Sequence, residues 1–144
     1  MPREIKFRGK RLDNSKWIHG YYCGVGDRSG IWGGDQRGTL AVIDEVNPET
    51  VGQYTGLRDK KRWEIYEGDI IQTYFAFGPG DAGYGVSQKP FVVVWDCERT
   101  AFRAKKPEAK HLHLLDIVDF FSMQSQLYEV IGNIHDNPEL LEVV

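Results

Sequence analysis

The stretch Phe91-Val92-Val93-Val94-Trp95 decides the fold class of this 144-residue chain. Its branched and aromatic side chains point to both faces of a short apolar run, which predicts a β-strand in the centre of a sheet. The turn residues 96–100 follow this strand, and residues 101–104 resume the β pattern. The middle of the chain is therefore predicted to be β-structure.

Short strands separated by turns are predicted on both sides of this central strand. Alternation of apolar and charged residues or enrichment in branched and aromatic residues marks segments 5–7, 17–22, 31–32, 40–46, 63–65, 70–71 and 127–134. Short helices are expected where Asn precedes Pro, at Asn47-Pro48 and Asn137-Pro138. Residues 111–121 fit a strand or a short helix. The Gly-rich segments 24–38 and 76–90 are predicted loops.

This pattern predicts a mainly β protein, a β-rich α+β fold with short helices only. The charged run Arg58-Asp59-Lys60-Lys61-Arg62 is interpreted as a solvated turn between two subdomains. We expect a short-stranded N-terminal β subdomain over residues 1–62. Residues 63–144 are expected to form a small barrel subdomain that ends in a short helix.

Composition is typical of a folded globular protein. Hydrophobic residues make up 41% of the chain and include seven Phe, seven Tyr and four Trp, which is enough for a core. Apolar runs are far shorter than the ~20 residues of a membrane helix, and no apolar signal stretch follows Met1. A cytoplasmic protein is therefore expected. Cys23 and Cys97 are predicted to be small buried hydrophobic residues.

Charge is distributed unevenly along the chain, whose formal net charge is −3. The basic head contains Arg3, Lys6, Arg8, Lys10 and Arg11 against Glu4 alone. Residues 111–144 contain acidic residues and no Lys or Arg. We expect head and tail to meet within one protomer or between protomers. Contact of the head with a phosphate backbone is the alternative, which the net acidity opposes.

Nucleotide-binding and esterase motifs are missing from the sequence. There is no P-loop, and Gly24-Val25-Gly26 followed by Gly30 departs by one residue from the dinucleotide-binding spacing. Neither Ser29 nor Ser87 lies in a GxSxG motif. The sequence therefore predicts no cofactor.

Three sets of residues are candidate chemical sites. His111 and His113 could bind zinc from one face of a strand, with Asp116 and His135 as further ligands, but two surface histidines are the simpler interpretation. The set Asp96, Glu108 and Lys110 resembles the acidic-acidic-lysine arrangement of metal-dependent nucleases. The third set is Glu64, Glu67 and Asp69. Turn chemistry explains it, because Gly68 permits a positive φ and Asp69 can accept a backbone hydrogen bond.

Aromatic residues are dense in the first half of the chain. The set comprises Trp17, Tyr21, Tyr22, Trp32, Tyr54 and Trp63. Core packing and a binding surface are both consistent with it, since Trp and Tyr are favoured where one edge of the ring stays wet. A mixed role is expected.

Six stretches follow one another along nearly the whole chain: Arg3–Lys10, Trp17–Tyr22, Pro48–Leu57, Ile65–Ile70, Val93–Trp95 and Val130–Leu141. In sequence and in order they resemble the YopX family of phage and prophage proteins. At Lys61-Arg62-Trp63 the chain departs from relatives, which often have an Asn-Gly-type turn there. The resemblance implies a phage or prophage origin, an SH3-like barrel in the C-terminal part and self-association. It implies no reaction and no catalytic residue.

Three functions follow from these observations. The first is a non-enzymatic accessory protein that binds a host or phage protein and forms a homo-oligomer, without membrane contact. The second is nucleic-acid binding through the basic head and residues 58–62. The third is a metal-dependent hydrolase. The residues predicted to bind are Arg3, Lys6, Arg8, Lys10, Arg11, Trp17, Tyr22 and Trp32.

Overall fold

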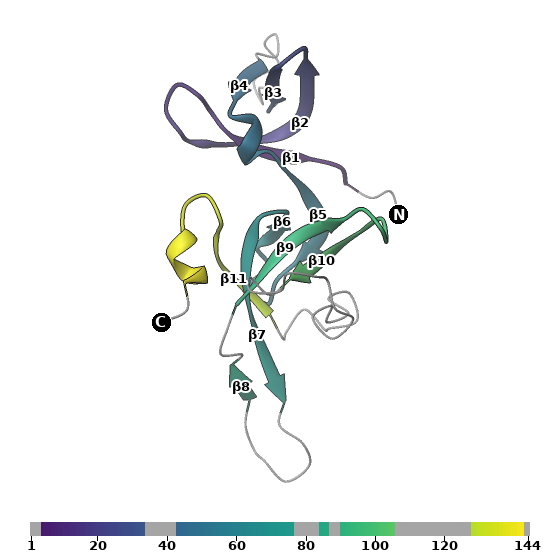
Figure 1. Ribbon diagram of the computed structural model, residues 1–144, viewed down its shortest axis with the longest axis vertical. Helices are drawn as coiled ribbons and strands as arrows, with labels where there is room; N and C mark the ends of the chain where they lie inside the picture. The colour runs from purple at the N-terminus through teal and green to yellow at the C-terminus, as the bar shows by residue number, and fades with distance from the viewer. Residues whose placement is uncertain (1–3, 34–42, 77–83, 87–89, 106–127, 143–144) are drawn as a thin grey trace. The chain divides into compact units, whose positions relative to one another are not determined.

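The computed structural model describes residues 4–33, 43–76, 84–86, 90–105 and 128–142. It divides the chain into two compact units, Met1–Gly56 and Leu57–Val144 (Figure 1). The sequence placed this boundary between residues 62 and 63. Both units consist of antiparallel strands, and the only helices among the described residues are two 3-10 turns, Pro48–Thr50 and Pro138–Leu141.

The first unit contains four consecutive antiparallel strands. They are β1 (Phe7–Lys10), β2 (Trp17–Val25), β3 (Arg28–Trp32) and β4 (Ile43–Val46). β1 pairs with the first half of β2, β3 pairs with the second half, and β4 pairs with β3. A bridge between Arg11 and Val46 then joins β4 to the end of β1. The four strands therefore roll up on themselves.

The inside of this roll is small and tightly packed. Ile31 and Val46 are buried completely or almost completely. Gly9 faces Val46 so closely that an added Cβ would lie 3.0 Å from its nearest methyl carbon. Only glycine fits at this position, because the backbone of β1 lies directly against the side chain of Val46 on β4.

A capped 3-10 turn connects the roll to the next strand. Asn47 Oδ1 accepts a hydrogen bond from the backbone N–H of Glu49 at 3.1 Å, and Pro48 occupies the first helical position. This is the start signal that the sequence predicted. β5 (Gly52–Arg58) follows and pairs with β1, opposite Phe7 and Arg8. Its last residues, Leu57 and Arg58, already belong to the second unit.

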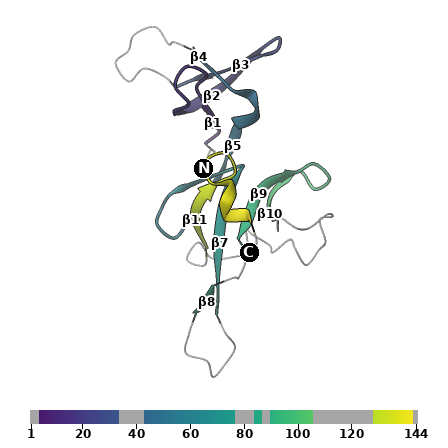
Figure 2. The same cartoon turned by 60° about the vertical axis from the view of Figure 1, so that its left-hand side comes forward.

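The second unit is built on a second sheet. β6 (Glu64–Tyr66) precedes β7 (Asp69–Ala76), β8 (Tyr84–Val86), β9 (Phe91–Asp96), β10 (Ala101–Lys105) and β11 (Tyr128–Asn133). The sheet has the order β10-β9-β7-β11, with β8 attached to β7 (Figure 2). β6 pairs instead with β5. Its core is formed by Ile65, Ile71, Phe91, Val93, Ala104 and Tyr128. The predicted central strand, 91–95, therefore lies inside the sheet.

A tight turn joins β6 to β7 as the residue pattern indicated. Gly68 has a φ of +88°, which favours glycine, and Asp69 accepts a hydrogen bond from the N–H of Tyr66 at 2.7 Å. Asp69 is 1% exposed. The turn therefore uses this carboxylate to hold its own backbone.

The mainly β class with short helices only is confirmed. Among the described strands no pairing closes the second sheet, which does not conflict with the small barrel expected there. Several details differ from expectation. β8 lies within the predicted loop 76–90, and much of the Gly-rich segment 24–38 belongs to β2 and β3. Cys97 is exposed rather than buried, because it lies in the turn after β9, and Cys23 is half-buried. The segment 111–121 lies outside the described residues.

Candidate functional site

Three of the predicted binding residues lie on one face of β1. Lys6, Arg8 and Lys10 alternate along the chain, so their side chains project from the same side of the sheet. The Arg8 guanidinium lies 4.6 Å from the centre of the Trp17 ring, and Lys10 Nζ lies 5.5 Å from it. Lys6 lies 5.1 Å from the Tyr54 ring. Arg3 is outside the described residues.

Carboxylates pair with several of the predicted basic residues, and Lys6 Nζ lies 3.2 Å from Glu4 Oε1. Arg11 donates to both carboxylate oxygens of Asp13, at 2.7 and 3.0 Å, and lies 3.4 Å from Asp44. The hydrogen bonding of Arg11 to the Asp13 carboxylate is the main reason why the pKa of Arg11 is raised. Lys60 and Lys61 both pair with Glu129 of the acidic tail. The cationic charge expected of Arg11 and of the run 58–62 is thus largely offset.

Tyr22 and Trp32 lie on opposite faces of the first unit and do not form one site. The Tyr22 ring lies 5.7 Å from Phe7 on the inner face, and its hydroxyl is within hydrogen-bonding distance, 3.2 Å, of Ser29. Trp32 pairs with Tyr21 on the outer face, where their ring centres are 5.4 Å apart. The predicted binding set therefore divides into a cationic row, an inner tyrosine and an outer tryptophan.

The outer face of β2, β3 and β4 presents large apolar side chains to solvent. Directly opposed residues of antiparallel strands point to the same side, so the register places Tyr21, Cys23 and Val25 of β2 together with Arg28, Gly30 and Trp32 of β3 and Ile43 and Glu45 of β4. The exposed fractions are 60% for Tyr21, 73% for Val25, 39% for Trp32 and 54% for Ile43. We call these eight residues the outer face.

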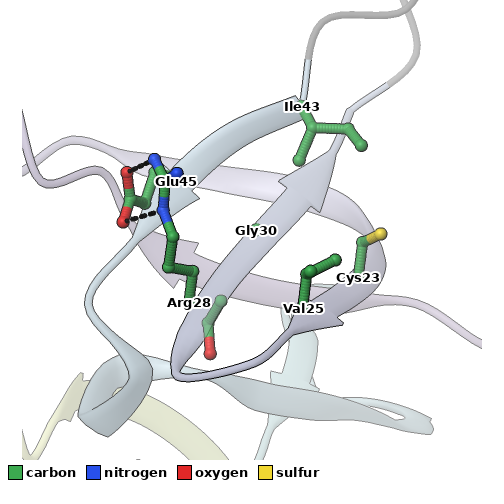
Figure 3. A pocket seen from close by; sticks show the side chains of 7 residues that line it. Cys23, Val25, Arg28, Gly30, Ile43 and Glu45 are labelled. Carbon is green, nitrogen blue, oxygen red and sulfur yellow. Dashed lines mark hydrogen bonds and ion pairs between the residues drawn. The ribbon is translucent and has the colours of Figure 1, made fainter.

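A groove of about 310 Å³ lies on the outer face (Figure 3). Cys23 and Val25 line it from β2, Ile43 and Glu45 line it from β4, and β3 crosses its middle at Gly30. A Cβ at Gly30 would lie 2.4 Å from the Ile43 Cγ2 methyl. Because Gly30 has no side chain, the Ile43 side chain can extend over β3, and the centre of the groove stays hollow. We call this hollow the outer groove.

One ion pair forms the polar side of the outer groove. Arg28 donates from Nε and Nη2 to the two carboxylate oxygens of Glu45, at 3.1 and 2.7 Å. These hydrogen bonds lower the pKa of Glu45 and raise the pKa of Arg28. The planar, two-pronged pairing holds the guanidinium at the edge of the groove and leaves the site without net charge.

None of the residues that line this groove is among the predicted binding residues. Val25 and Gly30 belong to the Gly-rich segment that was interpreted as a loop, and Ile43 lies in a predicted strand whose exposed face the pattern could not identify. Gly24 and Gly26 next to Val25 are typical turn residues, so the pattern predicted a loop where β2 in fact continues. The one available signal was the aromatic pair Tyr21 and Trp32.

Among the described residues, two members of the candidate chemical sites bond to neighbouring groups. Glu64 accepts from the Tyr66 hydroxyl at 2.8 Å and pairs with Arg58, and Asp96 accepts from the N–H of Glu98. His135 lies in the turn after β11. The remaining candidates, His111, His113, Glu108, Lys110 and Asp116, are outside the described residues. Within the described ranges, no three His, Cys, Asp or Glu side chains form a group that could hold a metal ion.

A buried carboxylate organises the start of the second unit. Asp59 is 1% exposed, and its Oδ1 accepts from the N–H groups of Lys61 and Trp63, both at 2.9 Å. Its Oδ2 accepts from the N–H of Val130 on β11 at 2.9 Å. Burial, followed by the charge of Asp59, raises the pKa of Tyr128. All three acceptor bonds serve the backbone, so Asp59 is an architectural residue.

In the described part of the chain, no helix is long and apolar enough to span a membrane. No curated protein matches the chain. The crystal structure of protein EF1440 from Enterococcus faecalis is similar, with a TM-score of 0.51, 22% identity, and coverage of 98% of this chain and 100% of that one. At this identity the likeness shows the fold alone. A family model described as YopX protein matches residues 6–142. Since this match spans nearly the whole sequence, the chain belongs to the YopX family.

Proposed function

We propose that this chain is a non-enzymatic accessory protein of a phage or prophage that binds another protein through its outer face. The observation that carries the proposal is the exposure of Tyr21, Val25, Trp32 and Ile43 on one side of the three neighbouring strands β2, β3 and β4. Contiguous exposed apolar side chains with a polar rim are typical of protein–protein interaction sites. Scattered single residues would need no such explanation.

Charge also favours a protein partner for this face. Arg28 and Glu45 neutralise each other across two hydrogen bonds. A surface that binds a phosphate backbone needs an excess of cations, because binding is driven by the release of counterions. An apolar centre with a neutral ion pair at its edge instead matches the anatomy of a protein interface, whose core is depleted of charge.

Affinity capture from host cells that carry the phage tests the proposal. Val25→Glu places a charge at the most exposed apolar position of the outer face, and Leu12→Glu is the matched control at an exposed position in the turn after β1. The partner should be recovered by the native chain and by the Leu12→Glu variant, and lost with Val25→Glu. Recovery should not depend on nuclease treatment. Equal recovery with both variants would refute the outer face as the binding surface.

Nucleic-acid binding is the second candidate, supported by the cationic row on β1. Lys6, Arg8 and Lys10 follow one another at about 7 Å intervals, two residues apart on an extended strand. Trp17 offers a ring beside two of them, and basic grooves with aromatic rings are typical of single-strand binding. This function predicts an affinity that falls steeply with salt. If the chain retards neither single- nor double-stranded DNA or RNA in a gel at low salt, nucleic-acid binding is excluded.

A further inference from the structure

The cationic row and the outer face lie on the same side of the first unit. β2 connects them, because alternate residues of a strand, here the odd-numbered ones, project to one side. In the first half of β2, Trp17 is directly opposed to Lys10 of β1, and in the second half Tyr21 is directly opposed to Trp32 of β3. A ligand that lies along this side of β2 therefore contacts basic side chains at one end and apolar side chains at the other.

The β1 end of this side has a formal excess of positive charge. Its basic residues are Lys6, Arg8 and Lys10, and His19 is directly opposed to Arg8. Glu4 lies 3.2 Å from Lys6 and offsets one of these charges. Arg8 is buried, whereas Lys6 and Lys10 are half-buried and His19 is exposed. Although the whole chain has a formal net charge of −3, this end therefore attracts anionic groups.

The other end of this side is apolar and has no net charge. Val25 and Ile43 line the outer groove, and Arg28 and Glu45 neutralise each other at its edge (Figure 3). With a volume of about 310 Å³, the groove has the size of the smallest ligand pockets. It therefore suits a side chain of a partner better than a whole large ligand.

The distance between the two ends sets the length of the ligand. Cys23 lines the groove, and it follows His19 by four residues and Trp17 by six. At about 3.3 Å per residue of a strand, these separations are roughly 13 and 20 Å. An extended peptide that lies along β2 covers them with the same number of its own residues.

We propose that the partner binds this side of the first unit through an acidic peptide segment. Its carboxylates contact Lys10 and His19, and an aliphatic residue about four to six positions away enters the outer groove between Val25 and Ile43. The inference rests on the proposed function, since it names the chemistry of the segment that the outer face binds. It also extends the binding surface from the groove to Lys10 and His19.

A nucleic acid matches this side of the first unit less well. Its charge repeats along the whole backbone, so phosphates that follow the cationic row toward the groove approach the carboxylate of Glu45. Val25 and Ile43 are aliphatic and offer no ring on which a base can stack. An acidic segment with a nearby aliphatic residue has its charges at one end only, as this surface does.

Selection from a library of random peptides displayed on yeast tests the inference, with the full chain as bait. Peptides enriched by the native chain should carry Asp or Glu about four to six residues from Leu, Ile or Val. Lys10→Glu reverses a charge of the cationic row, and Lys16→Glu makes the same change in net charge at an exposed position between β1 and β2. The acidic preference should be lost with Lys10→Glu and kept with Lys16→Glu. Val25→Glu should lose the aliphatic preference.

Fluorescence anisotropy with the most enriched peptide, synthesised with a label, measures the charge contact. At physiological salt, Lys10→Glu should raise the dissociation constant at least about tenfold, because an opposite charge becomes a like charge. Lys16→Glu should change it by less than about threefold, since exposed charges at a distance are screened. When Asn and Gln replace Asp and Glu in the peptide, the native chain and Lys10→Glu should bind it equally, because the two sites no longer interact.

Several results would overturn the inference. Enriched peptides without an excess of Asp and Glu would do so, and so would a Lys10→Glu protein that selects the same acidic peptides as the native chain. A native chain that enriches no peptide, or that binds single-stranded DNA more tightly than its best peptide, would also reject an acidic segment as the ligand. Far-UV circular dichroism establishes that each variant is folded, and Lys10→Gln replaces Lys10→Glu if the latter is not.

Capture from host cells separates this inference from the proposed function. If the enriched peptides lack acidic residues while Val25→Glu still loses the host partner, the acidic chemistry is wrong and the proposed function stands. If Val25→Glu captures the same partner and selects the same peptides as the native chain, both are refuted.

Discussion

Replacing Asp59 by Asn tests the role of the buried carboxylate most sharply. In the native protein Asp59 accepts three backbone hydrogen bonds, two in its own turn and one from Val130, 71 residues away in sequence. Asn has the same size and one carbonyl oxygen, which can still serve the N–H groups of Lys61 and Trp63. Its amide nitrogen is a donor and would face the N–H of Val130. The change therefore removes one bond and leaves a partly buried donor without an acceptor.

The magnitude follows from these contacts. A hydrogen bond to a charged group contributes about 1.5–3 kcal/mol, and a buried unsatisfied donor costs about 1–3 kcal/mol, two effects that overlap. We expect Asp59→Asn to lower the free energy of unfolding by about 2–3 kcal/mol. For a urea m-value of about 2 kcal/mol/M, the unfolding midpoint falls by roughly 1 M. Asp59→Ala, which loses all three acceptor bonds, should cost more.

Urea unfolding followed by far-UV circular dichroism measures this effect, and hydrogen exchange locates it. The Val130 amide should lose protection more than amides in the middle of β9. Asp13→Asn is the control, because Asp13 bonds only the exposed side chain of Arg11, and such a pair contributes at most about 1 kcal/mol. If the free energy of unfolding of Asp59→Asn lies within about 0.5 kcal/mol of the native value, the assignment of Asp59 as an architectural residue is wrong.

Three further changes have defined outcomes. Arg62 has a φ of +71°, so Arg62→Gly should stabilise the protein by up to about 1 kcal/mol in a urea titration, whereas a loss would mean that the Arg62 side chain matters more than its backbone strain. Gly20→Ala should prevent stable folding of the first unit, because its Cβ would lie 2.1 Å from the Trp32 carbonyl oxygen; an unchanged melting temperature would contradict this packing. The raised pKa of Tyr128 means that the unfolded chain ionises first, so the stability it contributes is present below pH 10 and is lost as the pH rises through the higher folded value. The decline of the urea midpoint above pH 10 should therefore be shallower in Tyr128→Phe, and an identical decline would exclude Tyr128 as its source.

The sequence was most informative where local chemistry determines structure. Phe91–Trp95 became an inner strand because its branched side chains are buried by neighbours on the sheet. Asn47-Pro48 began a 3-10 turn because an amide oxygen and a fixed φ favour that start. Gly68-Asp69 formed the predicted turn for the same kind of reason, a positive φ and a short acceptor side chain.

The features that the sequence could not provide depend on contacts between distant residues. The bridge from Arg11 to Val46 rolls up the first unit, and no local pattern encodes it. The same pairing decides that Ile31 points inward while Trp32 points outward. The outer groove exists only after Gly30 and Ile43 lie side by side on neighbouring strands. The sequence therefore could not predict how the candidate binding residues divide between the two faces of the first unit.

Site-specific photo-crosslinking in the host cell tests the central claim most directly. A photoreactive phenylalanine replaces Val25 on the outer face in one protein and Leu12, an exposed apolar residue in the turn after β1, in the other. Irradiation should join the chain to a protein, either a second copy or a host or phage partner, from position 25 and not from position 12. Products from position 12 alone, or equal yields from both positions, would contradict the account.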